Sequence, residues 1–150
     1  MSRHYVPDLG RLGALCEGNY ARLQQLWGLA EDREAAQFSL HNGSAYLGRV
    51  SIERLLRERY TDTYYLEQVH NAGRWLNNPR MTVRVYHDAR VAEVISCYRY
   101  RRIEAVHDYP NRYMHHPDEK VQINAFLADW LSYCLRFGHI ADQAVAWPEG

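Results

Sequence analysis

Histidine and carboxylate side chains gather at two points of the chain where chemistry could take place. His87 and Asp88 end an expected strand, and Asp118, Glu119 and Lys120 open the last expected helix. Neutral imidazole and carboxylate groups can hold zinc or iron, and they also bind small polar ligands through hydrogen bonds. The sequence therefore contains the residue types of a metal site or of a polar ligand site.

A meander of three strands is expected to bring these residues together. Alternating apolar and polar positions predict the strands Met81–His87, Val91–Tyr98 and Arg102–His107. In an antiparallel meander the first and third strands end at the same edge of the sheet. The loop that follows starts at this edge and delivers the first turn of the final helix. We therefore expect the two strand ends and the helix start to form one rim.

This rim is the predicted binding site for a small polar ligand or a partner peptide. Its candidate residues are Arg84, His87, Asp88, Tyr109, Asn111, His115, Asp118, Glu119, Lys120 and Asn124. The expected function is a non-catalytic ligand- or protein-binding module without a cofactor.

An alternative is a metal-dependent hydrolase that uses His87, His115 and Asp118 or Glu119. No motif of fixed spacing such as HExxH supports the metal site. The chain also lacks a G-x-S-x-G nucleophile turn and a glycine-rich phosphate loop. Catalysis is therefore the less favoured interpretation.

A second alternative is single-stranded nucleic-acid binding through Tyr98–Arg102, where arginines alternate with tyrosines. Bases stack on aromatic rings while basic groups contact phosphates. However, 18 basic residues balance 18 acidic ones, and a nucleic-acid binder usually has a basic excess on one face. Nucleic acid is therefore not the expected partner.

Length and composition predict one globular domain over residues 1–150. The chain is 47% hydrophobic and 24% charged, as in ordinary globular proteins. No apolar run approaches the roughly 20 residues that cross a bilayer, and the N-terminus lacks the apolar stretch of a secretory signal. Cys16, Cys97 and Cys134 form no CxxC pair. We expect a cytoplasmic protein with reduced thiols and no membrane partner.

The expected fold is α+β, with two layers. Apolar spacing predicts helices over about residues 8–27 and 117–137, on either side of a β region over about residues 36–107. That region should form an antiparallel sheet of about five to six strands, a hairpin plus the meander. The hairpin should turn at Asn42-Gly43. Arg49–Arg57 fits a strand or a helical turn, with the strand favoured, and Ile140–Gly150 is expected to be a short tail.

One ordered string of residues resembles a known family. It comprises Met81–Val94, Tyr109-Pro110-Asn111, His115, Asp118–Lys120 and Gln122–Leu131. The string is similar to the YqiB-like family of proteobacterial domains of unknown function (DUF1249). The resemblance implies a cytosolic, stand-alone protein of about this length, and it implies no activity because the family has none assigned. The family pattern tends to carry an aromatic residue in place of His107, which disfavours a metal site that uses His107.

Overall fold

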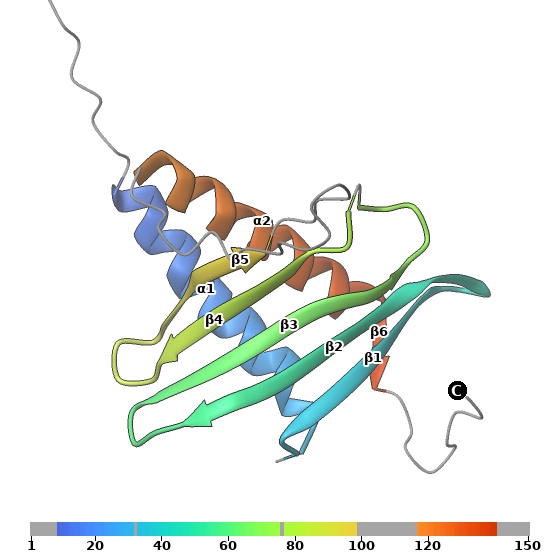
Figure 1. Cartoon of the computed structure of the whole chain (residues 1–150), viewed down its shortest axis with the longest axis horizontal. Coiled ribbons are helices and arrows are strands. Elements are labelled where there is room, and N and C mark those ends of the chain that lie inside the picture. The colour runs from blue at the N-terminus through green and yellow to red at the C-terminus, as the bar shows by residue number, and fades with distance from the viewer. Residues whose placement is uncertain (1–8, 32, 76, 99–116, 141–150) are drawn as a thin grey trace, which may run out of the picture.

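Two helices cover one face of a six-stranded antiparallel sheet (Figure 1). The computed structural model describes residues 9–31, 33–75, 77–98 and 117–140. Its elements in chain order are α1 (Leu9–Gly28), β1 (Ala35–Asn42), β2 (Ala45–Arg57), β3 (Thr61–Asn71), β4 (Arg80–Tyr86), β5 (Val91–Tyr98), α2 (Pro117–Phe137) and β6 (Gly138–Ile140). The strand order is β5-β4-β3-β2-β1-β6. The predicted α+β architecture is confirmed, and Arg49–Arg57 is part of strand β2.

Strand alternation puts the apolar side chains of the sheet under the helices. Met81, Val83 and Val85 of β4 are fully buried, while the residues between them are only half-buried. The same face receives Leu23 of α1 and Leu127 of α2, both without exposed surface. Each such side chain stabilises the fold by about 1.5–3 kcal/mol relative to an exposed one. Within the described chain, neither helix is long and apolar enough to cross a bilayer.

The sixth strand follows directly from the end of α2. β6 pairs with β1, with Ile140 opposite Phe38. A Cβ atom on Gly138 would lie 2.5 Å from the carbonyl oxygen of Cys134, so only glycine allows the chain to leave the helix here. The prediction that Ile140 begins a tail was therefore wrong, because a pattern of three residues is too short to identify a strand. The predicted strand Arg102–His107 lies outside the described residues.

The β1–β2 hairpin turns one residue later than expected. Asn42 pairs with Ala45, so Gly43 and Ser44 are the two central residues of the turn. Gly43 has a φ of 64°, and glycine in the first central position is typical of type II′ turns. The prediction of the hairpin is confirmed, but its placement of Asn42 inside the turn was wrong.

A buried amide joins α2 to a bulge between β2 and β3. Gln68 is 1% exposed; its Nε2 donates to the carbonyl oxygens of His70 at 2.6 Å and Arg49 at 3.4 Å. Its Oε1 accepts a hydrogen bond of 2.8 Å from Nε1 of Trp130. A Cβ on Gly48, whose φ is 140°, would clash with the His70 carbonyl oxygen. The close approach at Gly48 and the amide of Gln68 together hold the bulge under Trp130.

We expect Gln68→Leu to lower the free energy of unfolding by about 2–4 kcal/mol, because it leaves the Trp130 indole N–H and two strand carbonyls without partners. Urea unfolding followed by tryptophan fluorescence measures the change. Gln122→Leu, at an exposed position of α2, is the matched control and should change stability by less than about 0.5 kcal/mol. Equal effects of the two substitutions would contradict the proposed role of the Gln68 amide.

Candidate functional site

His87 lies in a network that joins a helix to two strand ends. Its Nδ1 lies 3.1 Å from the hydroxyl oxygen of Tyr20 on α1, and its Nε2 lies 3.0 Å from Oδ2 of Asp62 on β3. The Asp62 side chain is 9% exposed and that of His87 is 32% exposed. A carboxylate only accepts hydrogen bonds, so Nε2–H donates to Asp62, and in the neutral ring Nδ1 then accepts a hydrogen bond from the Tyr20 hydroxyl. The prediction that His87 continues the buried side of its strand is confirmed.

The network continues through Tyr64 to a salt bridge between Arg54 of β2 and Glu34, the residue before β1. The hydroxyl of Tyr64 donates to Oδ2 of Asp62 at 3.3 Å. Burial raises the pKa of Tyr64 to about 12, and the Asp62 carboxylate adds to the shift. The Arg54 guanidinium near Tyr64 binds Glu34 at 2.8 Å and lies 5.7 Å from the centroid of the Trp27 ring. Its hydrogen bond to Glu34 lowers the pKa of that carboxyl.

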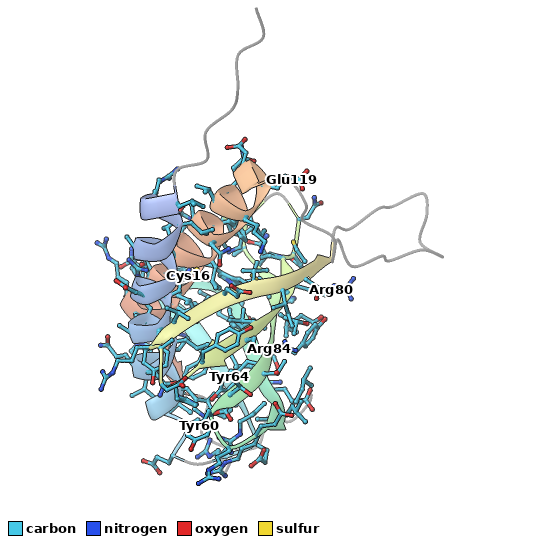
Figure 2. All side chains as sticks on the ribbon, turned by 90° about the vertical axis from the view of Figure 1, so that its left-hand side faces the viewer. Cys16, Tyr60, Tyr64, Arg80, Arg84 and Glu119 are labelled. Atoms are coloured by element: carbon cyan, nitrogen blue, oxygen red, sulfur yellow. The ribbon has the colours of Figure 1, made fainter. Side chains whose placement is uncertain are left out.

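Residues at the start of α2 lie far from His87. The backbone N–H of His87 donates to the carbonyl oxygen of Tyr60 at 2.8 Å, which places His87 beside the turn between β2 and β3. Figure 2 shows Tyr60 near one end of the molecule and Glu119 near the other. Lys120 lies near Cys16, whose thiol pKa burial raises to about 11 while Lys120 opposes the shift. The structure therefore separates the two halves of the predicted rim, because α1 supplies the partner of His87 that was expected from α2.

Two further candidates on the predicted rim have other surroundings. Oδ1 of Asn124 accepts a hydrogen bond of 3.0 Å from the backbone of Val94, and Nδ2 of Asn124 donates to the Lys120 carbonyl oxygen at 2.8 Å. Asn124 is 2% exposed, and its hydrogen bonds join α2 to β5. Arg84 lies on the sheet face away from the helices, as Figure 2 shows, opposite Glu93 of β5.

The remaining candidates, Tyr109, Asn111 and His115, lie outside the described residues. Among the residues that the structure describes, no group of three histidine, cysteine, aspartate or glutamate side chains is arranged to hold a metal ion. The binding roles of the ten candidate residues stay predictions.

Asp62 and Tyr20 were missed as partners of His87 in the sequence. Both lie in elements that periodicity predicts well, but nothing in the spacing of residues 20, 62 and 87 indicates that they meet. One signal was present: Asp62 stands among Thr61, Thr63 and Tyr64, where a carboxylate in a β-prone segment needs a partner when it is buried.

A second missed feature is a set of apolar side chains at the same end of the sheet as His87. Leu55, Leu56 and Tyr60 are 51%, 48% and 54% exposed. We call residues 55–60 the β2–β3 tip. The pairing of β1 with β2 ends at Ala35 opposite Glu53, so the β2–β3 tip extends beyond β1.

The chain belongs to the family of proteins of unknown function DUF1249, whose family model matches residues 22–140. It is 41% identical to the uncharacterized protein YqiB of Escherichia coli strain K12 over 139 residues, which cover 93% of this chain and 96% of that protein. YqiB of the Escherichia coli strains O6:H1 and O157:H7 is similar to the same extent. No solved structure matches the chain. The predicted family membership is confirmed.

We expect His87→Ala to lower the free energy of unfolding by about 1–3 kcal/mol, because the largely buried Asp62 carboxylate loses one of its hydrogen-bond donors and the Tyr20 hydroxyl loses its contact with the ring. Asp88→Ala, at the adjacent exposed position, is the control and should change stability by less than about 0.5 kcal/mol. Urea unfolding at neutral pH measures both values. A His87→Ala protein as stable as the wild type would show that this network does not stabilise the fold.

The raised pKa of Tyr64 predicts a pH dependence at the alkaline end. As pH rises above 10, the phenol ionises in the unfolded chain but stays neutral in the folded one until about pH 12, so its contribution to stability is lost over this interval. Tyr64→Phe lacks this group. The stability difference between wild type and Tyr64→Phe, measured by urea unfolding at pH 8, 10 and 11, should therefore shrink as pH rises. A constant difference would contradict the assignment.

Proposed function

We propose that this protein is a non-catalytic module of the cytoplasm that binds a protein partner at the β2–β3 tip. The observation that supports this function is the exposure of Leu55, Leu56 and Tyr60 within six residues of one hairpin. Single exposed apolar residues are common on protein surfaces, whereas grouped ones are typical of interaction sites. The three reduced cysteines support the cytoplasmic location.

The geometry of β2 explains why these side chains are exposed. The ladder with β3 shifts register between Arg54 and Leu56, so that Leu55 is an extra residue in β2. Leu56 lies opposite Thr63, on the sheet face away from the helices. A bulge at the end of a strand reorients the side chains next to it. Burial of one leucine against a partner would contribute about 1.5–3 kcal/mol to the free energy of binding. The fold itself does not bury these side chains, so a partner can gain this contribution at the β2–β3 tip.

Charges around the β2–β3 tip favour an acidic partner. Arg57 and Arg59 are exposed, and the Arg59 guanidinium lies 5.3 Å from the centroid of the Tyr60 ring. The carboxylate between them, Glu58, accepts a hydrogen bond of 2.8 Å from the Thr61 hydroxyl. Arginine on an aromatic ring is frequent in protein interfaces, where it pairs with carboxylates. The proposed partner surface is therefore apolar with flanking carboxylates.

The predicted residues His87 and Asp88 have a place in this proposal. His87 lies next to Tyr60 through its backbone hydrogen bond, and Asp88 follows it in the exposed turn between β4 and β5. These two residues would therefore contact the edge of a partner bound at the β2–β3 tip. Asp118, Glu119 and Lys120 would not take part.

Site-specific photo-crosslinking in cells tests the proposal. A benzoylphenylalanine at position 60 should give a discrete crosslinked species, and one at position 119 should not, because the two positions lie at opposite ends of the molecule. In the position-60 protein, Leu56→Asp should remove the species, because a carboxylate replaces an apolar contact and repels an acidic partner. Crosslinks at position 119 alone, or crosslinks at position 60 that survive Leu56→Asp, would contradict the proposal.

A further inference from the structure

Four aromatic side chains form a continuous row across four neighbouring strands. His41 of β1 lies between His139 of β6, at 6.4 Å between ring centroids, and Tyr46 of β2, at 5.4 Å. The Tyr46 ring lies 6.0 Å from that of His70 on β3. We call these four side chains the ring row. Three of the eight histidines of the chain therefore meet in a site that none of the predictions from sequence included.

Strand register places the ring row on the sheet face away from the helices. His139 is opposite Ser39, whereas its neighbour Ile140 is opposite the fully buried Phe38. Residues directly opposite each other in an antiparallel pair share a face, so His139 points away from the core. Tyr46 is 42% exposed, and His70 and His139 are exposed as well. The rings are therefore accessible to a ligand.

The parts of the strands that carry the ring row contain no carboxylate, whereas Glu53, Asp62 and Glu67 lie further along β2 and β3. No aspartate or glutamate occurs between residues 35 and 52, between 68 and 87, or between 130 and 140, although the whole chain has 18 of them. Arg49 lies opposite His70 in the β2–β3 ladder and opposite Ser39 in the β1–β2 ladder. This end of the sheet is therefore locally basic in a chain whose net charge is zero, and it favours an anionic ligand.

The exposed rings, which are tilted by 45–58° to one another, and the nearby arginine together indicate which class of ligand fits this surface. A metal ion is disfavoured, because no three ligating side chains in the described residues are arranged to hold one. An extended peptide that adds a strand pairs with the edge of a sheet, whereas the ring row lies on the sheet face. Histidine and tyrosine rings instead offer faces on which nucleobases stack, and an arginine nearby contacts phosphate.

We propose that the ring row binds nucleobases that carry phosphate, either in a free nucleotide or in a single-stranded nucleic acid. A base stacks on the face of Tyr46 or on that of the neighbouring His41, whose ring plane is tilted by 58° to it, and the phosphate lies toward Arg49. This inference is independent of the proposed protein partner, because the two sites lie at opposite ends of β2. It also differs from the predicted nucleic-acid site at Tyr98–Arg102, which is at another place in the chain.

Fluorescence anisotropy with a labelled single-stranded oligonucleotide of about twelve nucleotides tests the proposal at low salt. Tyr46→Ala and His41→Ala should each weaken binding roughly tenfold, since stacking of one base is worth about 1–3 kcal/mol. Tyr46→Phe should retain binding, because it keeps the ring and loses only the hydroxyl. Tyr86→Ala, at the end of β4 and outside both proposed sites, is the matched control and should bind as the wild type does. Circular dichroism verifies that each variant is folded.

Competition and salt dependence separate the two sources of the ligand. If a mononucleotide displaces the labelled oligonucleotide at a concentration similar to that of unlabelled oligonucleotide, the ligand is a free nucleotide. If displacement needs a much higher mononucleotide concentration, the ligand is a single strand. Both outcomes agree with the proposal. Arg49→Gln should reduce the slope of log affinity against log salt by about 0.7, the value for one phosphate contact. Absence of binding at low salt, or equal binding by wild type and Tyr46→Ala, would overturn the proposal.

Discussion

Burial of one face of the sheet by both helices is the constraint on which the rest of the structure depends. The apolar side chains of β1 to β5 all require cover, and α1 and α2 provide it on one side only (Figure 1). The opposite face and the strand ends remain accessible in the described part of the chain, where alternate residues are polar, aromatic or charged. Both proposed binding sites, the β2–β3 tip and the ring row, lie where this one-sided burial leaves side chains exposed.

Buried polar groups determine how the helices sit on the sheet. Apolar contact alone is non-directional, whereas a buried amide without partners costs about 1–3 kcal/mol. Gln68 binds Trp130, Asn124 binds the backbone of β5, and Asn19 of α1 donates to the Asn124 carbonyl oxygen at 3.0 Å. These bonds fix the rotation of α2 about its axis and join it to α1. Tyr20 and His87 hold the other end of the sheet under α1 in the same way.

At the candidate site, local sequence patterns predicted the orientation of a side chain but not its neighbours in space. Strand alternation correctly placed His87 on the buried side of β4, because side chains alternate along any strand. The expected neighbours were wrong in space: the rim required α2 to start beside the β4–β5 turn, and α1 lies there instead. Which of two amphipathic helices covers a given strand end depends on packing among residues far apart in the chain, such as Tyr20 and His87, which are 67 positions apart.

Local sequence patterns also did not predict the ring row, because its residues are far apart in the chain. Its members come from four strands, and their alignment depends on register shifts between Leu40 and His41 and between Arg49 and Val50. A shift of one residue would turn a side chain to the other face. Only the pair of His41 and Tyr46, flanking a recognisable hairpin turn, carried a local signal.

The sequence by itself determined the elements of this protein and its family. Helical and alternating apolar periods are local properties, and the string of residues from Met81 to Leu131 is specific enough to identify the DUF1249 family. Only the tertiary structure decided which helix meets His87, that Gly138–Ile140 adds an edge strand beside β1, and that four rings align on the sheet face away from the helices. Those features depend on register and on buried hydrogen bonds between distant residues, and both are settled only when the whole chain packs.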